Sequence, residues 1–195
     1  LKPAVATGGL VPLAAVLYRA TRGDLGANPI AEALNRMGLL ALVFLVLSLA
    51  CTPLKVVFGY TWPLRVRRML GLLAFFYGSL HVLTYAGLDQ VWDLESIVID
   101  ITKRPFILVG FVAWLLMVPL AVTSTQGMLQ RLGFRRWKRL HRLAYLSALL
   151  GVVHFVMRVK KDVTEPALYG AVLGVLLLVR IVDGLRAGKR GVPAQ

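Results

Sequence analysis

Residues 141–154 read HRLAYLSALLGVVH, and this stretch decides the environment of the chain. Two of the three histidines bracket a run that is otherwise nearly all apolar. A run of this kind is typical of a membrane-spanning helix, in which an ionisable side chain is costly and marks a candidate functional site. The position of an imidazole near each end of this helix therefore needs a chemical reason.

The composition of the whole chain agrees with a membrane protein. Hydrophobic residues make up 58% of the 195 residues, whereas soluble domains average about 45–50%. The 23 lysines and arginines outnumber the 9 aspartates and glutamates, but they lie between apolar spans and form no aromatic-interleaved surface. This pattern favours charged loops on a polytopic membrane protein and disfavours nucleic acid as a partner. The single cysteine, Cys51, allows no intramolecular disulfide and no cysteine-based metal site.

Six apolar spans are predicted as helices, at residues 4–18, 36–52, 69–87, 105–123, 140–157 and 166–183. Each has about 15–19 residues, close to the number that crosses a hydrocarbon core of about 30 Å. Because backbone groups must satisfy one another in lipid, these spans are helices rather than open strands. We predict an all-α, polytopic bundle of six transmembrane helices in one domain, residues 1–195, with sequential helices mostly antiparallel neighbours.

The loop charges predict the orientation of the bundle. The loops 53–68 and 124–142, together with the tail from 180, hold 14 basic residues against one acid. The remaining loops hold 8 basic and 8 acidic residues, and Lys2 is counted in neither group. The first group includes Arg190 of the tail, and the second group includes Lys160. The positive-inside rule then places the first group, and both termini, in the cytoplasm.

This orientation gives each histidine a depth. His81 lies 12 residues into the third span, and His154 lies 14 residues into the fifth, which corresponds to about 18 Å and about 21 Å from the inner boundary. The two are therefore level to within one turn, whereas His141 lies about 20 Å below His154.

Histidines at equal depth on two helices favour a haem iron, which takes two axial ligands on opposite faces. Hydrogen bonding between helices is the alternative for each histidine alone, and zinc is disfavoured because it needs three or four close ligands. His141 and His154 are about 140° apart around an ideal helix. Either a bulge or bend near Gly151 brings them to one cavity, or only one of them binds iron.

Four stretches resemble a known family: RRMLGLLAFFYGSLH (67–81), KRPFILVG (103–110), PLAVTSTQGMLQRLG (119–133) and WKRLHRLAYL (137–146). The chain resembles the haem-binding membrane subunit of the bacterial periplasmic protein-methionine-sulfoxide reductase system. That family belongs to the ferric-reductase-like transmembrane superfamily, which includes the NADPH oxidases. The resemblance extends over nearly the whole chain and is weakest in the first 35 residues.

The superfamily pattern has two histidines on the third helix and two on the fifth, holding two stacked b-type haems. The pattern is met by His81, His141 and His154, but the inner position of the third helix corresponds to Arg68 or Arg67. Arginine is permanently charged and is a poor iron ligand. The resemblance therefore implies one haem b on His81 and His154, and leaves a second, inner haem on His141 as an open alternative.

The resemblance also implies a function in the bacterial inner membrane. An electron-transfer subunit of this kind, itself not the catalytic subunit, passes electrons to a periplasmic molybdopterin-containing methionine-sulfoxide reductase that repairs oxidised periplasmic proteins. The family implies the quinol pool or a cytoplasmic flavin reductase as donor, with FMN or quinone as a further cofactor. A stand-alone ferric or quinone reductase is the alternative, and a transporter with packing histidines is a third interpretation, disfavoured because no broken-helix repeat is present.

Two charged segments complete the predicted site. The basic residues near the inner boundary are predicted either to anchor the bundle or to bind a haem propionate, flavin or quinol: Arg67, Arg68, Arg135, Arg136 and Arg139, with Trp137 at the interface. The acidic residues of loop 88–104 are either solvated or a docking surface for the partner: Asp89, Asp93, Glu95 and Asp100. Electrons are expected to enter at the first segment and to leave beneath the second.

Overall fold

The computed structural model describes residues 2–159 and 161–189, so two of the basic residues counted above, Lys160 and Arg190, lie outside the described residues. Within that part every regular element is helical. Six helices are long and apolar enough to cross a membrane, and they coincide with the six predicted spans. The all-α, multi-pass prediction is therefore confirmed.

The membrane-spanning elements correspond to the predicted apolar runs, and α1, α2 and α9 extend beyond those runs at both ends. They are α1 (Lys2–Thr21), α2 (Pro29–Phe58), α3 (Arg67–Thr84), α5 (Pro105–Val122), α8 (Leu143–Arg158) and α9 (Thr164–Lys189). A 3₁₀ turn, η1 (Trp62–Arg65), precedes α3, and a π-helical turn, η2 (Tyr85–Asp89), follows it. Three short helices lie in the connections: α4 (Leu94–Lys103), α6 (Gln126–Leu132) and α7 (Phe134–Leu140).

Local sequence explains where several of these helices begin and end. Asn28 caps α2 by accepting a hydrogen bond from the Ala31 amide, and Gly59 ends that helix with a φ of 73°. Thr125 caps α6, and Gly133, with a φ of 72°, separates α6 from α7. These connections were expected as loops, so the short helices were not predicted from the apolar pattern.

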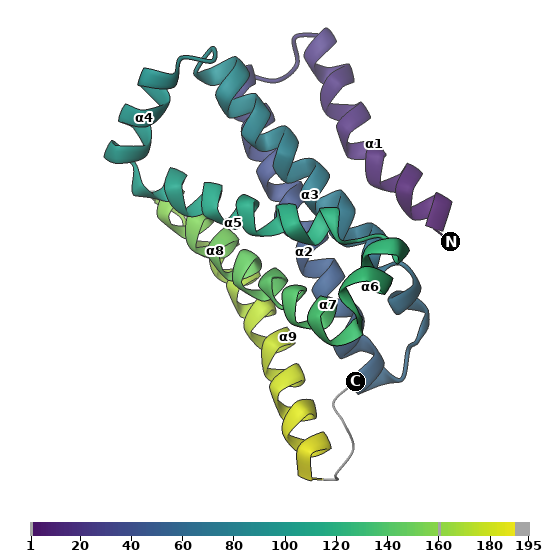
Figure 1. Ribbon diagram of the computed structural model, residues 1–195. Coiled ribbons are helices and arrows are strands. Elements are labelled where there is room, and N and C mark those ends of the chain that lie inside the picture. Colours follow the sequence, from purple (N-terminus) through teal and green to yellow (C-terminus); the bar gives the residue numbers. More distant parts are fainter. Residues whose placement is uncertain (1, 160, 190–195) are drawn as a thin grey trace.

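Two antiparallel helix pairs form the bundle, α2 with α3 and α5 with α8, and α9 packs beside α8 (Figure 1). Their common core comes from α2, α3, α5, α8 and α9, with Leu49, Ala74, Met117, Ala148 and Leu173 among its buried members. Ser147 donates a hydrogen bond to the Ala113 carbonyl at 2.8 Å and so joins α8 to α5 inside this core. The expectation of antiparallel neighbours holds for these pairs.

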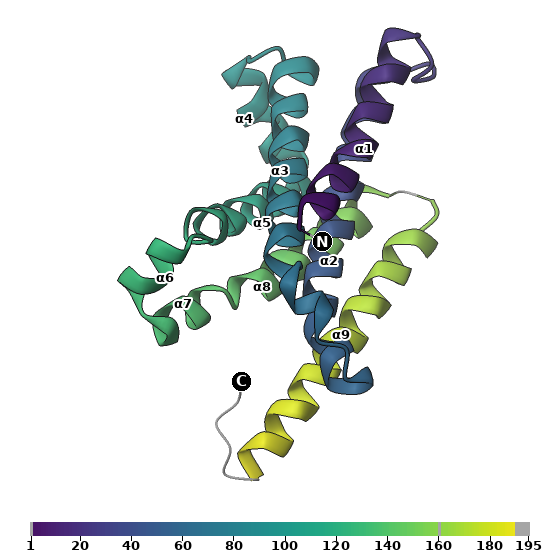
Figure 2. The same cartoon turned by 90° about the vertical axis from the view of Figure 1, so that its right-hand side faces the viewer.

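Helix α1 is the exception, because it lies away from most of the bundle (Figures 1 and 2). Its main attachment is to α3, where the fully buried Tyr77 hydroxyl donates a hydrogen bond to the Gly9 carbonyl at 2.6 Å. Gly9 also lies against Leu73, so closely that a Cβ there would clash with the leucine Cδ1. Many large apolar side chains on α1, α5, α8 and α9 are exposed, as expected for surfaces that face lipid.

Candidate functional site

The side chains of His81 on α3 and His154 on α8 lie close together in the bundle. Their ring centroids are 6.1 Å apart and the ring planes are inclined by 81°. The two helices belong to different antiparallel pairs, α2 with α3 and α5 with α8. The predicted equal depth of these two histidines is therefore accompanied by direct proximity.

Each of these imidazoles is held by a backbone carbonyl of the helix paired with its own. His81 Nδ1 lies 2.9 Å from the Leu34 carbonyl oxygen on α2, and His154 Nδ1 lies 2.7 Å from the Phe106 carbonyl oxygen on α5. A carbonyl can only accept, so each Nδ1 carries the hydrogen and donates it. In a neutral ring the lone pair is then on Nε2, which is the arrangement that metal-binding histidines use.

Two glycines make room for these rings. A Cβ on Gly38 would lie 3.1 Å from His81 Nδ1, and a Cβ on Gly110 would lie 2.6 Å from His154 Nδ1. Each glycine follows the anchoring carbonyl by four residues, as Gly38 follows Leu34 and Gly110 follows Phe106. The two helix pairs thus repeat one arrangement of carbonyl, glycine and imidazole. Both glycines were missed by the sequence analysis, and Gly110 was visible only as the last letter of the quoted stretch KRPFILVG.

His141 lies in a different environment. It caps the C-terminus of α7 at the break before α8, rather than inside the fifth membrane helix as expected. The Thr123 hydroxyl donates to the Pro119 carbonyl at 2.6 Å, so at the 3.2 Å contact with His141 it accepts from Nε2. The lone pair of His141 is then on Nδ1, and Trp137 stacks on the ring at a centroid distance of 3.9 Å.

Of the two alternatives for His141 and His154, the realignment at Gly151 is not found. Helix α8 is continuous from Leu143 to Arg158, and Gly151 packs on Leu42 inside it. The chain instead breaks at residues 141–142, because α7 and α8 are separate helices joined by a turn. The histidines at the two ends of the opening stretch therefore do not share one cavity.

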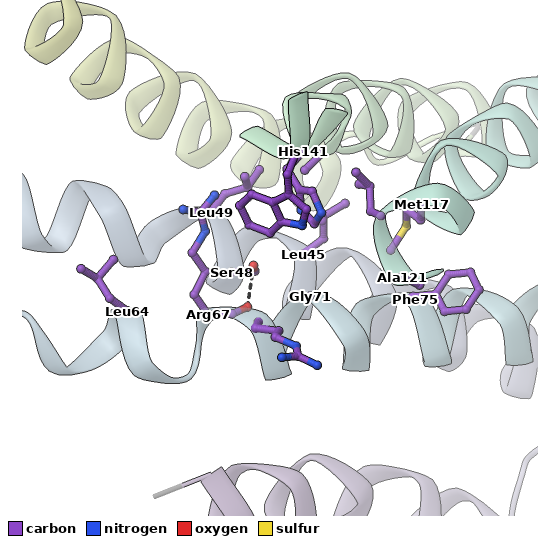
Figure 3. Close-up of a pocket in the computed structure, with 14 residues that line it drawn as sticks. Leu45, Ser48, Leu49, Leu64, Arg67, Gly71, Phe75, Met117, Ala121 and His141 are labelled. Carbon is purple, nitrogen blue, oxygen red and sulfur yellow. Dashed lines mark hydrogen bonds between the residues drawn. The ribbon is translucent and has the colours of Figure 1, made fainter. Parts of the chain in front are cut away.

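A cavity of about 340 Å³ lies at the end of the bundle that carries α6 and α7, and His141 is in its wall. This volume is within the range of small-molecule sites. Figure 3 shows the side chains of Arg67, Met117 and His141 around it, from three separate helices or turns. Arg68 and Trp137 also contribute to the wall, so the structure brings together three of the six residues predicted to bind propionate, flavin or quinol.

The other three predicted basic residues lie on α7, outside this cavity. Arg136 and Arg139 line a second hollow of about 330 Å³ with Leu140 and Leu143. Arg135 lines neither space. Helices α6 and α7 project sideways from the bundle, as Figure 2 shows. The basic segment on α7 lies beside the first cavity, because Trp137 and His141 are part of the wall of that cavity.

Arg180 was counted with the charged tail, but the structure places it inside α9 against the bundle. Its guanidinium donates to the Tyr145 hydroxyl at 2.6 Å and to the Leu49 carbonyl at 2.5 Å, and the Nε atom is buried without a partner in the described part of the chain. Arg180 therefore ties α9 to α8 and α2 and is not a solvated loop residue.

The acidic residues at the opposite end are only partly available to a partner. Asp93 caps α4, accepting hydrogen bonds from the Ser96 hydroxyl at 2.6 Å and from the amides of Glu95 and Ser96. These bonds, led by the one from the Ser96 hydroxyl, lower the pKa of Asp93 below its usual value of 3.8. Asp100 pairs with Arg104 at 3.1 Å and accepts from Tyr85. Asp89 accepts a hydrogen bond from the side chain of its neighbour Gln90. Glu95 is therefore the one of the four whose carboxylate has no hydrogen bond or ion pair within the described residues.

No group of three or more histidine, cysteine, aspartate or glutamate side chains within residues 2–159 and 161–189 could hold a metal ion. The candidate site is therefore His81 and His154, with the carbonyls of Leu34 and Phe106 and the glycines Gly38 and Gly110. This pair of histidines inside six membrane-spanning helices defines the class, a multi-pass membrane protein with a histidine site in its bundle. Residues 34–152 match the family model described as ferric reductase like transmembrane component, so the chain belongs to this family of multi-pass membrane proteins.

Within that class the similarity is closer still. The chain is 51% identical over 188 residues to the protein-methionine-sulfoxide reductase heme-binding subunit MsrQ of Rhodospirillum rubrum, covering 96% of this chain and 90% of the relative. It is 48% identical over 194 residues to the protein of the same name from Deinococcus radiodurans, covering 97% and 93%. A third, from Azospira oryzae, is 53% identical over 165 residues, covering 84% and 70%. The chain therefore belongs to the family of these MsrQ subunits.

Proposed function

We propose that the chain is a haem-binding electron-transfer subunit in which His81 and His154 are the axial ligands of a haem b iron. The observation that carries this proposal is the 6.1 Å separation of their ring centroids. A metal midway between two imidazoles, with metal–nitrogen bonds of about 2 Å, requires centroids roughly 6 Å apart. The names of the relatives, which call those proteins heme-binding subunits, support the same conclusion.

The residues around the histidines fit this role. Haem iron supplies one-electron chemistry when it is bound there. The carbonyls of Leu34 and Phe106 hold each ring in one tautomer and orientation, which increases the basicity of the opposite nitrogen. Gly38 and Gly110 let the rings lie close against the neighbouring helices. The packing of the helices thus positions both ligands.

The electrons are proposed to reach a periplasmic, molybdopterin-containing methionine-sulfoxide reductase. Conversion of a sulfoxide to a thioether consumes two electrons and two protons and releases water, so the partner needs a continuing electron supply. The relatives are named as subunits of a protein-methionine-sulfoxide reductase. The repair of oxidised periplasmic proteins is the corresponding role for this chain, which is then an electron carrier rather than the catalytic subunit.

We place the protein in the bacterial inner membrane with both termini in the cytoplasm, on the basis of the loop charges. The end with α6 and α7 is then cytoplasmic, and the end with α4 is periplasmic. His81 and His154 lie nearer the α4 end, since the carbonyl of Leu34 near the start of α2 and that of Phe106 at the start of α5 hold them.

The cavity bounded by Arg67, Arg68, Trp137 and His141 is proposed as the site where electrons enter. Its guanidinium groups suit an anionic group such as a flavin phosphate or a haem propionate, and its apolar wall suits a quinol. Quinol or a cytoplasmic flavin reductase is the proposed donor, with FMN, quinone or a second haem as the group bound there. A second haem bound through His141 Nε2 requires that nitrogen to exchange the contact with Thr123 for iron, which makes it the less favoured of these.

The first test is the visible spectrum of the purified protein, oxidised and reduced with dithionite. The reduced bands of low-spin haem b are expected, and a colourless protein would refute the proposal. Re-oxidation of the reduced protein is then followed with the purified partner reductase and methionine sulfoxide, and separately with chelated ferric iron or a quinone. Fast re-oxidation by the partner system supports the subunit role, whereas fast re-oxidation by iron or quinone alone supports a stand-alone reductase.

A further inference from the structure

Arg158 connects the supports of both paired histidines. It follows His154 by four residues on α8, so the two side chains lie on the same face of that helix. Its Nη1 donates a hydrogen bond to the side-chain oxygen of Asn35, which is the residue after Leu34 on α2. Leu34 is the residue whose carbonyl holds His81. The guanidinium therefore spans the gap between α8 and α2 beside the two imidazoles.

The charge of Arg158 is not neutralised by a carboxylate in the described part of the chain. At the same end of the bundle Arg36 pairs with Glu32 at 2.7 Å, and Arg104 pairs with Asp100 at 3.1 Å. Within residues 2–159 and 161–189 the partners of Arg158 are the amide oxygen of Asn35 and the ring of Phe155, whose centroid lies 5.9 Å from the guanidinium carbon. Because a guanidinium carries five N–H donors, most of its capacity is left for an anion.

The position of this charge indicates which anion it meets. It lies one helical turn beyond His154 on α8, and the Asn35 that it bonds is next to the residue whose carbonyl holds His81. Arg158 is exposed, and its hydrogen bond to Asn35 and its place over the ring of Phe155 keep the guanidinium at the gap between α8 and α2. A group bound between the two imidazoles would present an oxyanion to this guanidinium.

We propose that Arg158, positioned by Asn35, binds a carboxylate of the haem held by His81 and His154. This inference rests on the proposed function of the two histidines. Arginine is suited to the role because its planar fork can pair with both oxygens of one carboxylate. A permanent positive charge beside the iron also favours the reduced state, since net charge near a haem is one of the determinants of its potential.

The experiment compares Arg158→Gln, Arg158→Lys and the control Arg36→Gln in the detergent-purified holoprotein. Arg36 is a matched control, because it lies at the same end and its charge is already offset by Glu32. Haem transfer to apomyoglobin gives the rate of haem loss, and a redox titration gives the midpoint potential. Loss of a charge-assisted hydrogen bond should speed haem release roughly tenfold or more in Arg158→Gln and lower its potential. Arg158→Lys should have a midpoint potential close to that of wild type but should release haem faster. Arg36→Gln should match wild type in both the potential and the release rate.

A second arm reconstitutes wild type and Arg158→Gln with haem dimethyl ester, which has no free carboxylate. If Arg158 binds the haem carboxylate, the difference in release rate between the two proteins disappears with the ester. A difference that persists with the ester would show that Arg158 acts on lipid or on the fold, and would overturn the inference. Equal release from wild type and Arg158→Gln with ordinary haem would also overturn it. Failure of the proposed function has a different result, because wild type itself would then bind no haem.

Discussion

His81 and His154 approach each other to a ring-centroid distance of 6.1 Å, although they come from helices in different antiparallel pairs. The Nδ1 atom of each imidazole donates a hydrogen bond to a backbone carbonyl on the other helix of its pair. The pair is therefore set by the packing of four helices.

Replacement of either paired histidine should abolish low-spin haem. In His81→Ala or His154→Ala one axial ligand is lost and a coordination site opens, so any haem that stays bound becomes high-spin. His141→Ala should retain the low-spin spectrum, because His141 lies in a separate cavity and donates to Thr123. Absorption and electron paramagnetic resonance spectra of the three purified variants measure this. A low-spin spectrum unchanged in both His81→Ala and His154→Ala would remove the basis of the ligand assignment.

Addition of one methyl group at Gly110 should weaken haem binding without removing a ligand. The new Cβ would lie 2.6 Å from His154 Nδ1, so the ring has to leave the Phe106 carbonyl or push α5 away from α8. Overpacking of this kind costs about 1–3 kcal/mol. Gly38→Ala should have the same effect more weakly, since its contact would be 3.1 Å.

The matched control is Gly174→Ala on α9, where an added Cβ meets nothing within 4 Å. That variant should keep the haem content and spectrum of wild type, and the helix should gain up to about 1 kcal/mol from the better helix former. Haem content per protein and the rate of haem release are the measurements. Indistinguishable values for Gly110→Ala and Gly174→Ala would contradict the role given to Gly110.

Neutralisation of the cavity arginines should slow the arrival of electrons. Arg67→Gln and Arg68→Gln remove positive charge from the wall of the cavity with His141, so an anionic flavin or a quinol head binds more weakly there. Arg135→Gln is the control, because Arg135 lines neither cavity. Stopped-flow reduction by reduced flavin or quinol should be slower for the first two variants only. Equal slowing in all three variants would indicate general surface charge rather than this cavity.

Docking of the partner should depend on the open acidic residues near α4. Glu95→Gln together with Asp89→Asn removes charge and leaves the helix cap of Asp93 and the Asp100–Arg104 pair intact. Re-oxidation of haem by the partner should then slow at low salt, and the difference from wild type should shrink as salt rises, because screening weakens electrostatic steering. A defect that is independent of salt would argue against steering by this surface.

The N-terminus of α4 should loosen at acid pH. The pKa of Asp93 is lowered in the folded protein from its usual value of 3.8, chiefly by the Ser96 hydroxyl. The stabilisation it contributes is therefore complete above the unfolded value and is lost as pH falls through the lower, folded value. Amide hydrogen exchange at Glu95 and Ser96 should accelerate relative to the intrinsic rate in that range. Asp93→Asn keeps a capping side chain that does not titrate, so this acceleration should be absent from it.

The six membrane-spanning helices could be predicted because they depend on local composition. Each apolar span is long enough to cross the hydrocarbon core by itself, and the depth of His81 and His154 follows from counting residues along two helices. The short helix α4 was missed because its length and mixed composition give no membrane signal, although Asp93 followed by Ser96 is a recognisable cap.

The sequence by itself determined six membrane helices, the level of the paired histidines and the family resemblance. Only the tertiary structure decided the features that depend on how helices rotate and pack: the carbonyls of Leu34 and Phe106, the space left by Gly38 and Gly110, and the tie between Arg158 and Asn35. It also placed the break in the fifth span at His141 and left the helix continuous through Gly151. The physical reason is that hydropathy records burial in lipid one helix at a time, whereas hydrogen bonds and close contacts between helices depend on residues far apart in the chain.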